Sequence, residues 1–505
     1  MSSAKPTTRL PANTRRRVDV AIVGAGFSGL GLAMRLKRAG ESDFVVIEKN
    51  DDVGGTWLVN TYPGCACDVQ SHLYSFSFEQ NPDWSRTFAS QPEILRYLRH
   101  CAQRDGLREH LRLGTAVERA RWDQDQGHWE LPLSSGETIH ARVLVSAVGG
   151  LSRPVIPELP GLADFQGQAF HTQQWRHDLD LTGKQVAVVG TGASAVQLVP
   201  AIAPQVGQLD LYQRSAAWIL PKPDRPVGLT ERLLYRGSRR ALDAQRARLY
   251  LTAEARALAM VDNPRLMKLA EREAKSWLRR QVPDRALRRK LTPDYPMGCK
   301  RVLMSNDYYP ALTRPNCELI TGGVQRVTPT GLVGGDGIER PADLIVFGTG
   351  FDVRNPLGPV PVTGRDGLDL GTSWAGSPRA YLGCTVSGFP NLFVMLGPNT
   401  GLGHNSIIYM IESQTAYVMD ALKQMRRKRV HSVEVRPEVL RRYIDEMDRR
   451  SAGTIWARDC NSWYLDDQGR NFSLWPGYTW QYRQRTRRFR MHDYIPARAP
   501  AAAGA

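Results

Sequence analysis

The chain has 505 residues, of which 42% are hydrophobic, and a formal net charge of +17. This length predicts about three domains. No apolar run approaches the roughly 20 residues that span a bilayer, so a membrane-spanning protein and a membrane partner are excluded. The seven cysteines have no repeating spacing and fit a reducing compartment, so we expect a cytoplasmic protein.

The positive charge is concentrated in one segment. Residues 231–290 carry 17 Lys or Arg against 7 Asp or Glu. Apolar residues recur there at helical spacing, which predicts a helical insertion over 222–295. No aromatic residues alternate with the basic ones in the manner of a nucleic-acid site, so we expect a solvated helical face that favours the approach of anionic ligands, and no nucleic-acid partner.

A first glycine turn follows a buried strand. Residues 18–23 (VDVAIV) form an apolar run, and residues 30–39 read as the helix after it. Gly24 permits a tight turn, Gly26 lets the backbone approach a pyrophosphate, and Gly29 lets helix and strand pack closely, with Phe27 and Ser28 between them. The next strand ends in Glu48 and Lys49, at the distance where an acid binds a ribose 2′-hydroxyl. An acid there repels a 2′-phosphate and indicates FAD or NAD.

A second glycine turn has the same construction and a different strand end. Strand QVAVV leads into the turn, and QLDLYQ is followed by Arg214 and Ser215 where an acid would otherwise stand. An arginine and a hydroxyl accommodate a 2′-phosphate, which indicates NADPH. The alternative is an ordinary surface arginine. The residues of this turn are Gly190, Thr191, Gly192, Ala193, Ser194 and Ala195.

The remaining pattern predicts an α/β fold with two Rossmann-like dinucleotide-binding domains, for FAD and NADPH. Residues 87–112 read as helical, 131–150 as a hairpin with a returning strand, and 406–422 as a helix. We expect the FAD domain over 1–153 and 384–505, the NADPH domain over 154–221 and 296–383, and a disordered tail from Ile495. We expect no metal cofactor, and the oligomeric state stays open.

Two fingerprints resemble those of the flavin-dependent Baeyer-Villiger monooxygenases, class B flavoprotein monooxygenases. FQGQAFHTQQW, with Phe165, Gly167, His171 and Trp175, is similar to the FxGxxxHxxxW pattern. GGTWLVNTYPGCACD, from Gly54 to Asp68, resembles the second signature. One position departs from the family: Arg176 stands where Pro or Asp is usual.

The resemblance implies a reaction. NADPH reduces FAD, the reduced flavin captures O2 as a C4a-peroxide, and the peroxide attacks a ketone to give an ester or lactone. GCKRVLMSNDYYPALTRPN is similar to the segment that places Lys300 and the catalytic Arg301 over the flavin. A cation is needed there because negative charge develops, and Asp68 would hold it. The resemblance also implies flavin contacts for Gly55, Thr56, Trp57 and Tyr62 and an NADP contact for Trp463.

Other functions remain open at this point. A heteroatom-oxidising flavin monooxygenase shares both glycine turns, but its fingerprint normally lacks the tryptophan that stands here at Trp175, and it also lacks the second signature. A disulfide reductase needs a redox dithiol, and Cys65 and Cys67 are separated by a single residue. A non-catalytic redox-sensing protein would lack Arg301. We interpret His171 as a structural histidine that supports the linker between the nucleotide domains by hydrogen bonding, with a proton carrier as the alternative. The substrate pocket is expected where the domains meet.

Overall fold

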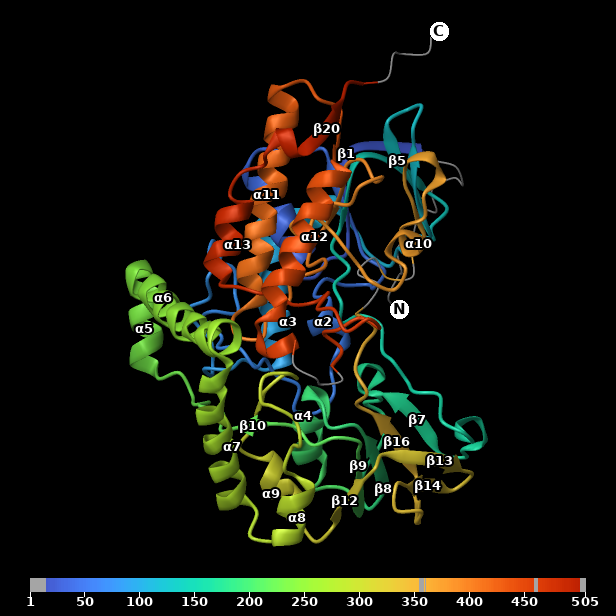
Figure 1. Cartoon of the computed structure of the whole chain (residues 1–505), viewed down its shortest axis with the longest axis vertical. Coiled ribbons are helices and arrows are strands. Elements are labelled where there is room, and N and C mark those ends of the chain that lie inside the picture. Colours follow the sequence, from blue (N-terminus) through green and yellow to red (C-terminus); the bar gives the residue numbers. More distant parts are fainter. Residues whose placement is uncertain (1–14, 354–357, 359, 458–461, 500–505) are drawn as a thin grey trace, which may run out of the picture.

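A computed structural model describes residues 15–353, 358, 360–457 and 462–499. Its larger sheet, which includes β1 and β5, lies in the upper part of Figure 1 beside the helices of the C-terminal part. The order is β17-β4-β5-β6-β1-β2-β3, and β18 also pairs with β6. Strands β1, β2, β3, β6 and β18 run parallel, and β4, β5 and β6 form an antiparallel meander. The strands are β1 (Arg15–Val23), β2 (Phe44–Ile47), β3 (Leu111–Arg112), β4 (Ala120–Asp123), β5 (His128–Pro132), β6 (Thr138–Ser146), β17 (Val362–Thr363) and β18 (Leu392–Val394).

Helices cover the parallel part of this sheet. Strand β2 is buried along its whole length, which explains its unbroken apolar sequence. Helix α1 (Phe27–Arg38) lies between the sheet and the long helix α11 (Ile407–Arg427). The other helices here are α2 (Thr56–Val59), α3 (Gln91–Arg104), α10 (Leu370–Trp374), α12 (Pro437–Ala452) and α13 (Thr479–Thr486).

The second sheet lies below the first in Figure 1 and is entirely parallel. Its order is β12-β9-β8-β16-β7. The second glycine turn follows β8, the central strand, which has β9 on one side and β16 on the other. The strands are β7 (Gln168–His171), β8 (Gln185–Val189), β9 (Gln208–Gln213), β12 (Cys317–Thr321) and β16 (Leu344–Phe347), with helices α4 (Ala193–Ile202) and α9 (Tyr308–Leu312). An antiparallel sheet of β13 (Val324–Thr328), β14 (Gly331–Gly334) and β15 (Glu339–Pro341) completes this part.

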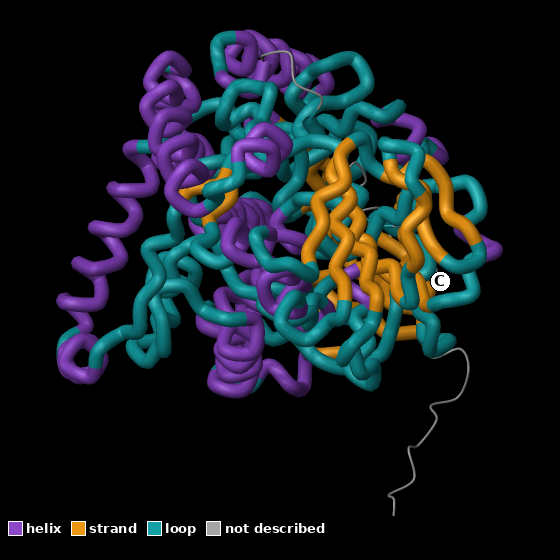
Figure 2. Tube along the Cα trace, turned by 90° about the horizontal axis from the view of Figure 1, so that it is seen from below, coloured by secondary structure: helices purple, strands orange, loops and turns teal. Residues whose placement is uncertain are grey.

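The helical insertion leaves the second domain after β10 (Ile219–Leu220) and returns before β11 (Leu303–Met304). Strands β10 and β11 pair with each other in parallel. Its helices are α5 (Leu229–Gly237), α6 (Arg239–Ala255), α7 (Met267–Gln281) and α8 (Arg285–Lys290). Figure 2 shows these helices gathered on the side opposite the strands. Buried Glu254 of α6 accepts hydrogen bonds from the Thr479 backbone and hydroxyl and from Asn405, which attaches the insertion to the first domain.

Three expectations from the sequence need correction. The helical region within 87–112 is divided, because α3 ends at Arg104 and Leu111–Arg112 already form β3. The chain is back at the first sheet with β17, which pairs with β4, before residue 384 where we expected it to return. The tail is ordered at its start, because β20 (Tyr494–Ala497) pairs with β19 (Ser432–Val435). Residues 500–505 lie outside the described part.

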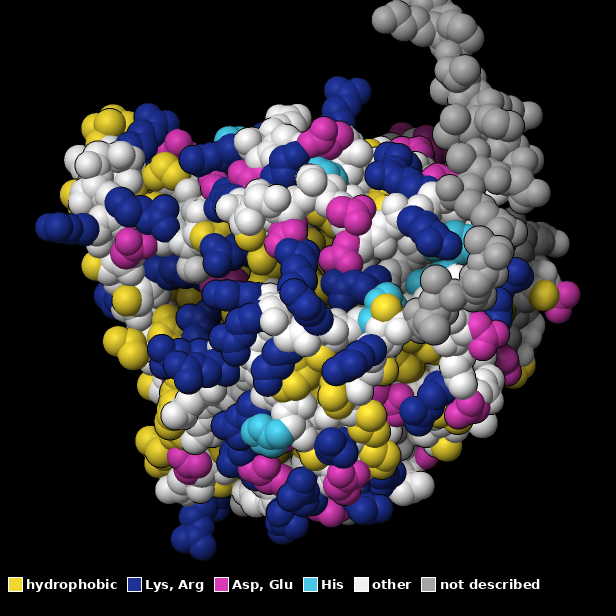
Figure 3. Space-filling view, turned by 90° about the horizontal axis from the view of Figure 1, so that it is seen from above, with side chains coloured by type: hydrophobic (Ala, Val, Ile, Leu, Met, Phe, Trp, Pro, Cys, Tyr) yellow, Lys and Arg dark blue, Asp and Glu magenta, His cyan; other side chains and the backbone are white. Residues whose placement is uncertain are grey.

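Charged side chains of both signs are mixed on the face seen from above. Figure 3 shows Lys and Arg spread over this face, with Asp and Glu among them. The insertion also exposes leucines, including Leu229 and Leu251. Among the described helices, none is both long and apolar enough to traverse a bilayer.

Candidate functional site

One cavity of about 1710 Å³ is lined by both glycine turns, and so by residues of both nucleotide-binding parts. This volume exceeds the roughly 300–1,000 Å³ of a pocket for one small ligand. The predicted residues that line it are Gly24, Gly26, Phe27, Ser28, Glu48, Lys49, Gly55, Thr56, Trp57, Tyr62, Asp68, Gly190, Thr191, Gly192, Ala193, Ser194, Arg214, Ser215, Lys300, Arg301 and Trp463. The structure therefore brings together the residues predicted for two separate nucleotides.

The first glycine turn has the geometry that its sequence predicts. Gly24 has φ +107°, which favours glycine. A Cβ on Gly29 would lie 1.8 Å from the Gly24 oxygen, so Gly29 serves helix packing and lies outside the cavity lining. A Cβ on Gly26 would meet only Gly55, at 3.5 Å, and both residues line the cavity. The wall beside Gly26 is backbone, as close approach of a pyrophosphate requires.

The second turn repeats this arrangement. Gly190 has φ +109°, and a Cβ there would lie 2.6 Å from the Gly348 oxygen. Ala195 is fully buried beside Gly348, so it packs behind the turn without lining the cavity. Helices α1 and α4 begin here without a side-chain cap, and α1 and α4 have no acidic residue in the first turn. Their first N–H groups are thus available to phosphates.

Glu48 is oriented by the first turn. Its side chain is buried, and one carboxylate oxygen accepts a hydrogen bond from the Ala25 backbone N–H at 2.8 Å. The other accepts from the Asn50 backbone and side-chain nitrogens at 3.0 and 2.6 Å. The oxygen bonded to Ala25 retains a further lone pair. The carboxylate therefore fits a ribose hydroxyl, and Asn50 is a positioning group that we did not predict.

The end of β9 carries a cationic corner. Arg214 is exposed, and Lys300 Nζ donates to Ser215 Oγ at 3.3 Å while lying 4.5 Å from the centre of the Tyr295 ring. Burial, and then the charge of Arg214, lower the pKa of Lys300. Two cations beside one hydroxyl repel each other, and an anion such as a 2′-phosphate removes that repulsion. Tyr295 supports the corner by donating to the Ala216 carbonyl at 2.9 Å.

Arg301 and Asp68 meet on the cavity wall. Arg301 Nε and Nη2 both donate to Asp68 Oδ2, at 2.8 and 2.6 Å. The Arg301 side chain is 36% exposed because it faces the cavity, although it lies deep in the protein. The charge of Asp68 raises the pKa of Arg301 above its ordinary value, and burial opposes this. The guanidinium is therefore a permanent cation with a fixed direction.

Two further residues that line the cavity were not predicted. Tyr464 is buried, lines the cavity, and its pKa is raised by burial while Arg301 lowers it. It follows Trp463, which is 48% exposed, so the SWY tripeptide was the signal that could have found it. Gln197 of α4 accepts a hydrogen bond from the Tyr62 hydroxyl at 2.9 Å and donates to the Ala66 carbonyl at 2.9 Å. Gln197 thus joins the two nucleotide-binding parts.

The aromatic residues near the first turn are packed. Trp57 is 7% exposed and donates to the Tyr74 hydroxyl at 3.1 Å. Tyr62 is equally buried, and burial raises its pKa. A Cβ on Gly55 would lie 2.9 Å from Gly26 Cα, which explains a glycine there. These contacts shape the cavity wall and do not supply a proton carrier.

The FxGxxxHxxxW residues lie outside the cavity lining. Phe165 packs in the core of the second domain, and a Cβ on Gly167 would lie 2.5 Å from the Asp343 oxygen. Trp175 packs edge-on against Phe170. Arg176, the departure from the pattern, is exposed and forms an ion pair with Asp178 at 2.6 Å. This fingerprint therefore has a structural role in the packing of the second domain.

His171 lies in the same part of the second domain, at the end of β7. It is 1% exposed, its Nδ1 accepts from the Gln173 backbone at 3.1 Å, and its ring packs edge-on against the cavity-lining Phe351. Burial lowers the pKa of His171 to about 4. A neutral imidazole at pH 7 fits the structural interpretation and not a proton carrier.

Cys65 and Cys67 are both buried and free. Burial raises the pKa of Cys65 to about 11 and also raises that of Cys67. Protonated thiols are poor nucleophiles, so this pair does not fit a redox dithiol.

Comparison with known proteins identifies relatives of this chain. Residues 17–226 match the family model of flavin-binding monooxygenase-like proteins. The chain is 52% identical to a Baeyer-Villiger monooxygenase of Pseudomonas aeruginosa, over 99% of this chain and 95% of that protein. It is 46% identical to one of Streptomyces coelicolor, over 97% and 94%. The crystal structure of OTEMO in complex with FAD and NADP superposes with a TM-score of 0.85 at 28% identity, covering 95% of this chain and 99% of that one. The chain belongs to the Baeyer-Villiger monooxygenase family.

Proposed function

We propose that this chain is an FAD-containing, NADPH-dependent monooxygenase that inserts one oxygen atom of O2 beside a ketone carbonyl, to give an ester or lactone. The observation that carries the proposal is the Arg301–Asp68 pair, held in a cavity between two phosphate-binding turns. OTEMO was crystallised in complex with FAD and NADP, which supports the same two cofactors for this chain.

FAD would lie on the first turn. The N-terminus of α1 would face its pyrophosphate, Glu48 would accept from its ribose, and residues 54–57 would cover it. NADPH would lie on the second turn, with its 2′-phosphate between Arg214, Ser215 and Lys300. Trp463 would cover the NADPH. When bound, the flavin supplies the redox chemistry, accepting hydride from NADPH and activating O2.

Arg301 would stabilise negative charge on the ketone oxygen when its carbon becomes tetrahedral. A cation that is already oriented needs no reorganisation at that moment, so its effect on the rate is large. Asp68 would hold the guanidinium in place and would not itself transfer a proton. Trp57 and Tyr62, which are packed against the cavity, would help to exclude water.

The deciding experiment follows oxygen from 18O2. Purified yellow protein is supplied with NADPH and a panel of linear, cyclic and aryl ketones, together with a thioether and an amine. We expect a ketone-derived ester or lactone that carries one labelled atom, and thioether oxidation only as a side reaction. Clean turnover of the thioether or amine with no ester from any ketone would instead favour a heteroatom-oxidising monooxygenase.

A further inference from the structure

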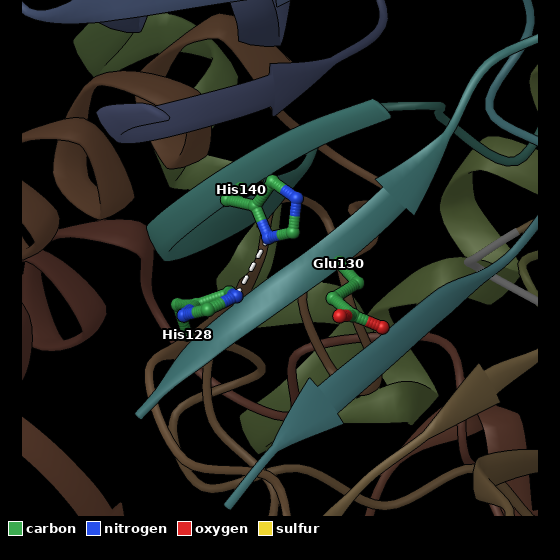
Figure 4. A group of neighbouring side chains, drawn as sticks. All are labelled: His128, Glu130 and His140. Atoms are coloured by element: carbon green, nitrogen blue, oxygen red, sulfur yellow. Dashed lines mark hydrogen bonds between the residues drawn. The ribbon is translucent and has the colours of Figure 1, made fainter. Parts of the chain in front are cut away.

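Three side chains that can bind a metal lie together on the meander of the first sheet. They are His128 and Glu130 of β5 and His140 of β6 (Figure 4). One ligand atom from each lies within 4.8 Å of those of the other two. None of the three lines the cavity described above. This group is therefore separate from the nucleotide and catalytic residues.

Strand geometry brings the three together. Residues two apart on a strand point to the same face, so His128 and Glu130 share a face of β5. The register of β5 with β6 places Glu130 directly opposite His140. All three are partly buried, so the side chains have limited freedom without being sealed from solvent. The sequence alone does not reveal this group, because the turn between β5 and β6 separates His140 from the other two.

The two imidazole rings already share a proton. His128 Nε2 and His140 Nδ1 are 2.7 Å apart, and Figure 4 shows this hydrogen bond. One nitrogen must be a bare acceptor, which is the form that binds a metal. Binding a cation at both nitrogens would require the donor ring to carry its proton on its other nitrogen, so both rings stay neutral.

We propose that His128, Glu130 and His140 bind one divalent transition-metal ion, of which Zn²⁺ is the best match, and that the ion links β5 to β6. Two imidazole nitrogens and a carboxylate form a ligand set that zinc prefers, with water in the remaining position. Zn–N bonds of about 2.0–2.1 Å at a tetrahedral angle place the two nitrogens roughly 3.3 Å apart. The rings thus need to separate by only a fraction of an ångström.

The charged groups nearby permit this change. Glu130 Oε2 forms an ion pair with Arg121 at 2.5 Å, and the Arg121 side chain is 53% exposed, so releasing the carboxylate costs little. Asp123 lies opposite His128 and adds negative charge, whereas Arg17 lies opposite His140. Arg142, on the same face of β6, is neutralised by Asp19 at 2.6 Å.

The test measures zinc uptake by the flavin-loaded protein after dialysis against a chelator. Equilibrium dialysis with zinc chloride, followed by elemental analysis, should give one Zn²⁺ per chain at micromolar free zinc. The variants His128→Ala and His140→Ala should lose this uptake, and Glu130→Gln should weaken it at least tenfold. The control His100→Ala removes an exposed histidine on α3 and should bind like the wild type.

A second measurement is the thermal midpoint with and without zinc. Zinc should raise the midpoint of the wild type and of His100→Ala but not of His128→Ala. If His140→Ala fails to fold, His128→Ala and Glu130→Gln decide the question. Absence of uptake by the wild type, or equal uptake by wild type and ligand variants, overturns the proposal. Neither readout depends on oxygenation, so failure here leaves the proposed function untouched.

Discussion

Arg301 and Asp68 are 233 residues apart in the chain, yet one oxygen of Asp68 accepts hydrogen bonds from both Nε and Nη2 of Arg301. Asp68 belongs to the first nucleotide-binding part, and Arg301 follows the helical insertion of the second. The direction of the guanidinium therefore depends on how the two parts meet. A charge placed in this way is useful only when both nucleotide turns face the same cavity.

Arg301→Ala should abolish ester formation while leaving the glycine turns intact. Losing one oriented charge contact costs about 10²- to 10³-fold in rate. We expect bound FAD, continued flavin reduction by NADPH, and release of O2 as hydrogen peroxide. Rapid-mixing absorbance together with product analysis measures each step.

Asp68→Ala should have a milder effect of the same kind, because it removes only the group that orients Arg301. Arg301→Lys keeps the charge and loses the two-nitrogen contact with Asp68, so it should rank with Asp68→Ala. An Arg301→Ala enzyme that converts ketone at nearly the wild-type rate would remove this arginine from the mechanism.

Arg214→Ala should raise the KM for NADPH and leave that for NADH nearly unchanged. A charge-assisted contact with phosphate is worth about 1.5 to 3 kcal/mol, which corresponds to roughly a 10- to 100-fold change. Arg176→Ala is the matched control, since Arg176 is also exposed but lies outside the cavity lining. Equal use of NADH and NADPH by the wild type would contradict the assignment.

The glycine turns and the α/β fold class were predictable because each depends on a local sequence pattern of strand, turn and helix. Gly24, Gly26 and Gly29 each occupy a position where the backbone conformation or a close neighbour leaves little room for a side chain, and a buried strand precedes them. The same holds for Gly190 and the strand ahead of it. Patterns of this type carry their own geometry, so sequence alone located both nucleotide turns.

Contacts between distant segments were not predictable in the same way. Gln197 reads as an ordinary polar residue of a helix, and only the packing of two domains makes it a link to Tyr62. Strand β17 is two residues long, too short for an alternating pattern, so the return to the first sheet was placed too late. The pairing of Arg301 with Asp68 came from the family resemblance and not from spacing.

Gln197→Ala should weaken the junction between the nucleotide-binding parts. The variant loses the hydrogen bonds with the Tyr62 hydroxyl and the Ala66 carbonyl, each worth about 1 kcal/mol. We expect retained flavin, a higher KM for NADPH and more hydrogen peroxide per NADPH consumed. Gln245→Ala, on the surface helix α6, is the control. Unchanged coupling would show that Gln197 is not needed to hold the two parts in register.

Acid should destabilise the protein partly through His171. Its pKa is about 4 in the folded protein against an ordinary value of 6.5, because burial disfavours the charged ring. Between these values the unfolded chain binds a proton that the folded protein does not, so stability falls as pH drops from 6.5 to 4 and is unaffected above 6.5. A difference of this size corresponds to roughly 3 kcal/mol. His72, whose pKa is also about 4, acts in the same direction.

Denaturant unfolding at pH 7, 6 and 5 should therefore show a shallower pH dependence of the unfolding free energy for His171→Asn than for the wild type. The exposed control variant His100→Asn should show the same pH dependence as the wild type. Identical pH dependence in His171→Asn and the wild type would mean that His171 is protonated when folded.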